Sequence, residues 1–197
     1  MKLTEAYQNL VKNISVIYHP REAENIADLV TEKISGITPQ NLRSTDRNLS
    51  DDEISAITSA EKRLLNNEPV QCILNEAWFY DAPFYVDRNV LIPRPETEEL
   101  VNWVIKENKN NSTFSILEIG TGSGCIPITL KRKLPQAKVL SCDISEGAIE
   151  VAKRNAAQLL AEVEFLQLDI LNPKNWMQLP IVDIIVSNPP YITNDEK

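Results

Sequence analysis

The segment Asn188-Pro189-Pro190-Tyr191 combines residue types that could hold a reacting nitrogen. Two consecutive prolines fix φ and restrict the preceding asparagine, so the backbone carbonyls there are held rigidly. The side-chain oxygen of Asn188 and the carbonyl of Pro189 can then accept the two hydrogens of a planar –NH₂ group, and Tyr191 can stack on its plane. Such a site would align the nitrogen lone pair with an electrophilic methyl group, chiefly through proximity and orientation. The alternative interpretation is an ordinary Asn-Pro turn.

A second segment, Gly120-Thr121-Gly122-Ser123-Gly124, holds three of the five glycines in the chain. It is expected to follow a strand and open a helix, where glycines let backbone N–H groups approach a ligand closely. The spacing departs from GxGxxG, and the Lys-Ser/Thr pair of a P-loop is missing, so the loop disfavours NAD or ATP.

Two aspartates are expected at the ends of the next two strands. Asp143 could accept both hydroxyls of a ribose. Asp169 could accept from an adenine amino group or orient its loop, or it could simply cap a turn or helix. Together with the glycine loop, these residues predict a nucleoside pocket that suits a cationic ligand better than a polyphosphate.

The elements that must position these residues alternate between strand and helix from residue 93 onward. A helix is expected at 95–107, strands at 114–119, 138–142, 163–168 and 181–186, and helices at 124–133 and 145–160. This alternation predicts an α/β fold with a parallel sheet covered by helices on both faces. Ligands of such sheets bind at the carboxyl ends of the strands, near the point where strand order reverses.

The region before residue 93 has a different pattern. Residues 1–66 are expected to form a small helical bundle, with amphipathic helices at 4–18 and 20–35 and a capping box from Ser50 to Glu53. Residues 67–92 predict a β-hairpin linker around a turn at 81–83. Its aromatic side chains either fill a small core or stack on a ligand; they are Trp78, Phe79, Tyr80, Phe84 and Tyr85.

Composition excludes several classes of protein. The 197 residues are 43% hydrophobic and 24% charged, which excludes a disordered or collagen-like chain. A net charge of −8 does not favour binding to nucleic acid, which depends on Lys and Arg. The absence of an apolar run long enough for a membrane span or signal core predicts a cytoplasmic protein. The three cysteines are expected to be reduced, and His19, the single histidine, is expected to be structural. No metal site is predicted.

The glycine loop, Asp143 and Asn188–Tyr191 resemble the amino-methylating class I methyltransferases, which use S-adenosylmethionine. The segments 90–98 (VLIPRPETE) and 68–74 (EPVQCIL) are similar to the HemK/PrmC family. The resemblance implies a Rossmann-like methyltransferase domain preceded by a helical domain and a hairpin. It also implies methylation of the glutamine side chain in the Gly-Gly-Gln motif of peptide chain release factors.

Roles for individual residues follow from this resemblance. The cofactor would be held by Gly120, Thr121, Gly122, Ser123, Gly124, Asp143, Asp169, Ile170 and Asn188. The glutamine would be bound by Asn188, Pro189, Pro190 and Tyr191, with Asn188, Pro189 and Tyr191 catalytic. The 93–96 segment would border the site, although Arg94 and Glu96 could equally form an ion pair that caps the following helix.

The resemblance also bears on organisation and partners. It implies a helical substrate-recognition domain at 1–66, a linker at 67–92 and the first four strands of the methyltransferase domain at 93–197. The family domain continues with further strands, so we expect a chain truncated at its C-terminus. We expect a monomer whose partners are release factors. Cys72 and Asn75 replace the family's usual Tyr and Gly, a departure that affects the hairpin. A DNA or RNA amino-methyltransferase and a non-catalytic docking module remain alternatives.

Overall fold

The computed structural model describes residues 1–42 and 44–189. The chain divides into two compact units, Met1–Leu74 and Asn75–Lys197. Among the described residues, no helix has the length and apolar character needed to cross a membrane. The two units are considered separately below.

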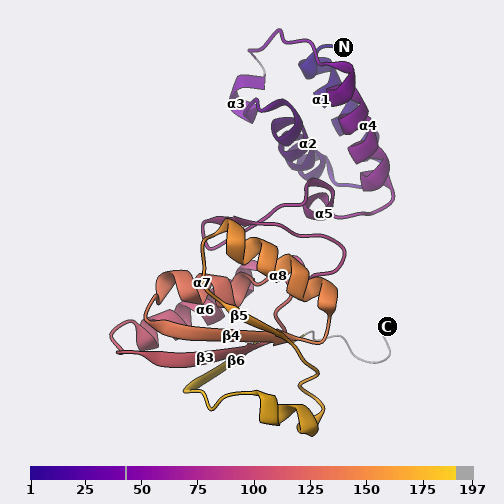
Figure 1. Cartoon of the computed structure of the whole chain (residues 1–197). Helices are drawn as coiled ribbons and strands as arrows, with labels where there is room; N and C mark the ends of the chain where they lie inside the picture. Colours follow the sequence, from indigo (N-terminus) through magenta and orange to yellow (C-terminus); the bar gives the residue numbers. More distant parts are fainter. Residues whose placement is uncertain (43, 190–197) are drawn as a thin grey trace. The chain divides into compact units, whose positions relative to one another are not determined.

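The first unit is helical and has its own apolar core. Its helices are α1 (Leu3–Ile14), α2 (Pro20–Ser35), α3 (Pro39–Leu42), α4 (Asp51–Leu65) and α5 (Val70–Leu74). Helices α1, α2 and α4 pack against one another (Figure 1) and bury residues such as Leu10, Val30 and Leu64. The predicted helices and the capping box at Ser50 are confirmed. Helix α1 ends at Ile14 rather than residue 18. The residues that follow form turns, in which the N–H groups of Ile17 and Tyr18 both donate to the Ile14 carbonyl.

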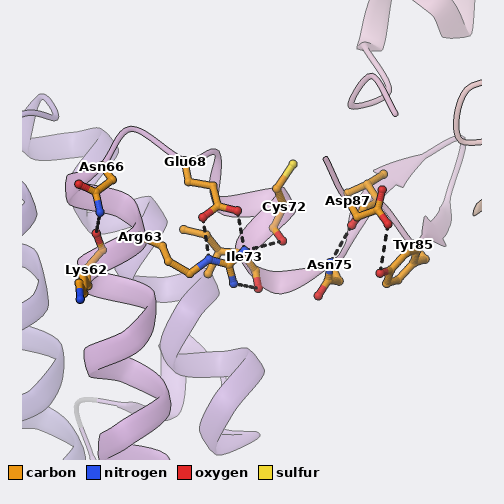
Figure 2. Close-up of polar contacts among 10 residues, drawn as sticks. Lys62, Arg63, Asn66, Glu68, Cys72, Ile73, Asn75, Tyr85 and Asp87 are labelled. Atoms are coloured by element: carbon orange, nitrogen blue, oxygen red, sulfur yellow. Dashed lines mark hydrogen bonds and ion pairs between the residues drawn. The ribbon is translucent and has the colours of Figure 1, made fainter. Parts of the chain in front are cut away.

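Helix α5 lies in the segment for which the sequence predicts only a hairpin linker. An arginine at the end of α4 secures it: the Arg63 guanidinium donates to the Glu68 carboxylate and, at 3.4 Å, to the carbonyls of Cys72 and Ile73 (Figure 2). Hydrogen bonding by Arg63 lowers the pKa of Glu68 from its usual value. The helical unit therefore extends to Leu74.

The second unit contains the predicted parallel sheet. Its elements are β1 (Ala77–Phe79), β2 (Ala82–Phe84), α6 (Pro95–Asn108), β3 (Phe114–Ile119), α7 (Cys125–Lys133), β4 (Ala137–Asp143), α8 (Glu146–Gln158), β5 (Glu164–Gln167), the 3₁₀ helix η1 (Pro173–Gln178) and β6 (Ile184–Ser187). The strand order is β5-β4-β3-β6, and each pair is parallel. The α/β class is thus confirmed. The sequence predicts domain boundaries after residues 66 and 92, and these remain predictions beside the two units that meet after Leu74.

The helices of this unit do not cover both faces as predicted. In the described part of the chain, α6, α7 and α8 lie on one face of the sheet, and only the η1 segment lies on the other (Figure 1). Right-handed crossovers explain this arrangement. The connections β3–β4 and β4–β5 run in the same direction, which puts α7 and α8 on one face. The β5–β6 connection runs back across the sheet on the opposite face, and it contains only η1.

The hairpin β1–β2 contributes to the core of the second unit. Phe79 and Phe84 are buried against each other with ring centroids 6.1 Å apart, so for these two rings the packing interpretation is confirmed. Trp78 is exposed. The turn falls at Tyr80 and Asp81, both at positive φ, and not at 81–83 as predicted. A two-residue turn of this kind matches the twist of the strands.

Candidate functional site

The predicted chemistry lies where β3 and β6 end side by side. Ile119 pairs with Ser187 in the parallel register, so Gly120 and Asn188 each directly follow a paired residue. The Ser187 hydroxyl also donates to the Ile119 carbonyl at 2.8 Å. Strand order reverses between β3 and β6, the place where open α/β sheets bind ligands. The sheet therefore brings the glycine loop and the Asn-Pro segment to one edge.

The glycine loop uses most of its backbone donors within the protein. The N–H groups of Gly120 and Thr121 donate to the Cys142 carbonyl, and those of Gly122 and Gly124 donate to Asp143 and Thr121. These N–H groups are therefore engaged within the protein, and the predicted approach of the loop backbone to a ligand stays a prediction. What the loop offers is room. A Cβ at Gly120 would meet nothing within 4 Å, and one at Gly122 only a carbonyl at 3.9 Å.

Gly124 has a different role from the other two glycines. A Cβ there would lie 2.8 Å from a methyl group of Ile128 and 3.1 Å from that of Ala152. Gly124 thus permits close packing of α7 on α8. Contact of Gly124 with a cofactor stays a prediction, as it does for Thr121 and Ser123, whose side chains are buried.

Asp143 ties the glycine loop to the start of α8. One carboxylate oxygen accepts from the Gly122 N–H at 3.0 Å and the other from the Ser145 N–H at 2.9 Å. A carboxylate has about four lone-pair positions, so it can accept further hydrogens from a ligand. Asp143 is half-buried beside the glycine loop, so its carboxylate is accessible to a ligand that carries vicinal hydroxyls, such as a ribose.

A pocket of about 210 Å³ lies beyond the ends of β4 and β5. It is lined by Ile144, Gln167, Leu168, Asp169, Asn175 and Gln178. Asp169 accepts from the Leu171 N–H at 2.9 Å, as in the turn-capping alternative, and it also borders the pocket. Ile144 exposes 66% of its surface and could cover one side of a flat ring. Sequence reasoning missed Ile144, although an apolar residue directly after the strand-end aspartate is a usable signal. Ile170 is partly buried and packs against the cluster formed by Leu117, Leu140, Cys142 and Leu168, and its contact with a cofactor stays a prediction.

The side chain of Asn188 forms a hydrogen bond with a residue of α6. Its side-chain nitrogen donates to the hydroxyl of Thr97 at 2.9 Å. Thr97 is only 7% exposed and lies in the first turn of α6, directly after the 93–96 segment that was expected to border the site. Pro189 is exposed, and the predicted residues Pro190 and Tyr191 lie outside the described residues.

Arg94 and Glu96 lie at the start of α6, where they could either border the site or form an ion pair that caps the helix. Arg94 occupies the N-cap position, and its side chain makes no capping hydrogen bond. Glu96 is exposed in the first turn, where a negative charge is favourable. Direct capping by Arg94 is therefore not observed, and the role of both residues at the site stays a prediction.

A buried polar chain lies under the glycine loop. The Ser141 hydroxyl donates to one carboxylate oxygen of Glu118 and shares a hydrogen bond with the Thr121 hydroxyl. The other oxygen of Glu118 has no partner among the described residues. Burial, reinforced by the nearby Asp143, raises the pKa of Glu118 to about 8 despite the Ser141 hydrogen bond. Glu118 is therefore expected to be protonated at neutral pH.

Asn155 on α8 joins the glycine loop to the chain that follows the hairpin. Its fully buried side chain donates to the carbonyls of Ser123 and Tyr85 at 2.8 and 2.9 Å, and it accepts from the Tyr85 N–H at 2.7 Å. The neighbouring Arg154 stacks its guanidinium 3.5 Å from the centre of the Tyr85 ring. Neither Asn155 nor Thr97 was singled out by sequence reasoning.

The comparisons with known proteins agree with this geometry. A family model, "Methyltransferase small domain", matches residues 97–197. A release factor glutamine methyltransferase from Flavobacterium psychrophilum is 40% identical over 95% of this chain and 66% of its own length. One from Koribacter versatilis is 35% identical over 98% of this chain and 68% of its length. The chain belongs to the release factor glutamine methyltransferase family. This result confirms the resemblance noted from the sequence.

Two further facts complete the comparison. The chain spans about two thirds of the length of these relatives. A solved SAM-dependent methyltransferase from Agrobacterium tumefaciens matches 58% of this chain and 39% of that chain, with a TM-score of 0.49 and 18% identity. The methyltransferase domain supports S-adenosylmethionine as the cofactor, as the resemblance implies.

Proposed function

We propose that this protein transfers a methyl group from S-adenosylmethionine to the side-chain nitrogen of the glutamine in the Gly-Gly-Gln motif of peptide chain release factors. The observation that carries the proposal is the juxtaposition of Asn188 with Gly120, each following one member of the pair Ile119 and Ser187. Membership of the release factor glutamine methyltransferase family supports it.

The residues of this chain fit the cofactor at three positions. Open space lies over Gly120 and Gly122, where a side chain would intrude. Asp143 can accept hydrogen bonds from ribose hydroxyls, and the pocket beside Ile144 and Asp169 is suited to a flat base. When bound, S-adenosylmethionine supplies a methyl group on a positively charged sulfur; the glutamine nitrogen takes this group as the carbon–sulfur bond breaks and then releases one proton.

The catalytic contribution of the chain is to hold the glutamine amide. We expect the oxygen of Asn188 and the carbonyl of Pro189 to accept the two amide hydrogens. The predicted role of Tyr191, which lies outside the described residues, is to stack on the amide plane. An amide nitrogen is a weak nucleophile because its lone pair is delocalised. Positioning, which can supply several kcal/mol of the barrier, is therefore the main effect required. A general base is not needed, because the proton can leave after transfer.

Cofactor binding is tested by titration calorimetry with S-adenosylmethionine on the Asp143→Ala variant. We expect the Kd to rise at least about tenfold, because the acceptor for the ribose hydroxyls and for the Gly122 N–H is lost. Asp183→Asn is the matched control. The Asp183 carboxylate accepts from Ser115 at the opposite end of the sheet, so this change should lower stability and leave the Kd unchanged. Equal effects of the two variants on the Kd would contradict the proposed site.

Methyl transfer is tested with a labelled methyl donor and a purified release factor, using the full-length protein. Wild-type protein should label the Gly-Gly-Gln glutamine, and Asn188→Ala should reduce turnover by at least about a hundredfold while cofactor affinity is retained. Turnover that survives Asn188→Ala would remove Asn188 from the mechanism.

The same assays distinguish the two alternative functions from the proposed one. A DNA or RNA amino-methyltransferase would label nucleic acid with a steep salt dependence, which the net charge of −8 does not favour. A docking module would bind release factor without binding cofactor.

We expect the helical unit to recognise the protein substrate. We also expect the protein to act as a monomer in the cytoplasm, where release factors work. Sedimentation of the full-length protein checks the monomer.

A further inference from the structure

We propose that Thr97 is a positioning residue that holds the Asn188 side chain in place, so that Asn188 can present its oxygen to the substrate. The inference rests on the proposed function, because it concerns how the same asparagine receives an –NH₂ group. It adds a residue on α6 to a site that is otherwise built at the ends of β3, β4 and β6.

The contact itself is specific and far from local. The Asn188 side-chain nitrogen lies 2.9 Å from the Thr97 hydroxyl oxygen, although the two residues are 91 positions apart in sequence. Thr97 is 7% exposed, and its backbone N–H donates to the Arg94 carbonyl, so the first turn of α6 holds it in place. This buried hydroxyl accepts from the nitrogen end of the Asn188 amide and so tethers the side chain.

The polarity matters because the two ends of an asparagine amide are opposites. The oxygen accepts hydrogen bonds and the nitrogen only donates them, and the two groups have nearly the same shape. An Asn188 that turned over would present N–H groups to the –NH₂ of the substrate, and two donors would then face each other. With the nitrogen bound to Thr97, the oxygen is directed away from Thr97. A threonine hydroxyl can donate as well as accept, so Thr97 fixes where the amide lies, and the –NH₂ group of the substrate selects its oxygen.

The matched variants are Thr97→Val and Thr97→Ser. Valine keeps the shape of threonine and removes the acceptor, whereas serine keeps the hydroxyl. In the full-length protein we expect Thr97→Val to lower kcat about tenfold or more, with cofactor Kd within about twofold of wild type. Thr97→Ser should recover most of the lost turnover. Thermal unfolding of each variant accompanies the kinetics, so that a loss of fold is recognised.

The Asn188→Ala background separates positioning from structure. Alanine has no amide for Thr97 to hold. We expect Thr97→Val to cost much less turnover when combined with Asn188→Ala than when made alone. A structural role for Thr97 would cost the same factor in both backgrounds. Equal factors, or full turnover in Thr97→Val alone, would overturn the inference.

A spectroscopic readout is independent of catalysis. The side-chain amide protons of Asn188 are assigned in nitrogen–proton correlation spectra by their disappearance in Asn188→Asp. They should shift in Thr97→Val and return toward their original position in Thr97→Ser; unchanged signals in Thr97→Val would overturn the inference. Wild-type protein that labels no release factor would instead contradict the proposed function, and the spectra would still decide whether Thr97 holds Asn188.

Discussion

Glu118 lies fully buried at the end of β3 with a pKa raised from 4.5 to about 8, so the folded protein holds a proton there that the unfolded chain releases above about pH 4.5. Between these two values the folded state binds more protons than the unfolded state, and stability must therefore fall as pH rises. The stabilising contribution is complete below about pH 4.5 and is lost as the pH passes through about 8. If Glu118 were ionised, its oxygen that has no hydrogen-bond partner among the described residues would carry charge away from water.

Replacing Glu118 with glutamine should remove this pH dependence. Glutamine keeps the shape of the side chain but does not titrate. The free energy of unfolding should fall with pH more steeply in wild type than in Glu118→Gln between about pH 5 and pH 8, by at most about 1.4 kcal/mol per pH unit. Urea titrations at several pH values, followed by tryptophan fluorescence, measure both slopes. Parallel slopes for the two proteins would show that Glu118 is already ionised in the folded state.

Motif residues were predictable at this scale, and their supporting partners were not. Gly120, Asp143 and Asn188 are recognisable because each lies at the carboxyl end of a strand and has a distinctive residue type. Thr97 and Asn155 sit in amphipathic helices, where a single polar residue carries no signal. Their partners lie 91 and 70 residues away, so only the folded chain brings the groups together. Asn75 drew notice in the sequence only as a departure from the family resemblance. In the structure it has a positive φ of 53°, which asparagine tolerates, and its side-chain nitrogen donates to the Val86 carbonyl at 2.9 Å.

At the scale of elements, α8 organises the site through one side chain. Asn155 contacts the glycine loop and both backbone groups of Tyr85. Truncating it leaves two buried carbonyls and one N–H without their partner, and each lost group costs about 1–3 kcal/mol. A single position on a helix thus connects the end of the hairpin to the loop that is proposed to face the cofactor.

We expect Asn155→Ala to destabilise the second unit by roughly 3 kcal/mol and to weaken cofactor binding. Lys153→Ala, an exposed change on the same helix, should alter stability by no more than about 0.5 kcal/mol. Urea unfolding followed by tryptophan fluorescence, together with cofactor titration, measures both effects. Comparable stability of the two variants would mean that the three hydrogen bonds of Asn155 are replaced by other contacts.

Long elements were predictable, and short ones were not. The strand at 114–119 was predicted with its observed bounds, because an apolar run ends at a glycine. The five-residue helix α5 was missed, since so short a segment shows no period. The hairpin turn was misplaced because Pro83 is a strong turn former. In the structure Pro83 lies within β2 of a two-stranded sheet, where a strand tolerates a missing N–H.

At the scale of the whole molecule, each unit has a core of its own. The residues of the first core lie between Leu3 and Ile73, and those of the other two cores all follow residue 75. All three tryptophans, Trp78, Trp103 and Trp176, belong to the second unit. Tryptophan fluorescence therefore reports only the second unit. The helical circular dichroism reports both units, the first through α1, α2 and α4 and the second through α6, α7 and α8.

This separation predicts that a core truncation in one unit spares the other. Leu64 on α4 is fully buried, and Leu64→Ala should destabilise the helical unit by about 2–5 kcal/mol. The adjacent Leu65 is 37% exposed, so Leu65→Ala is the matched control, with an expected change of about 0.5 kcal/mol. In Leu64→Ala part of the circular dichroism signal should be lost at lower urea, while the fluorescence transition and the cofactor Kd stay at their wild-type values. Because a single cooperative core would shift both signals together, coincident shifts would refute two independent units.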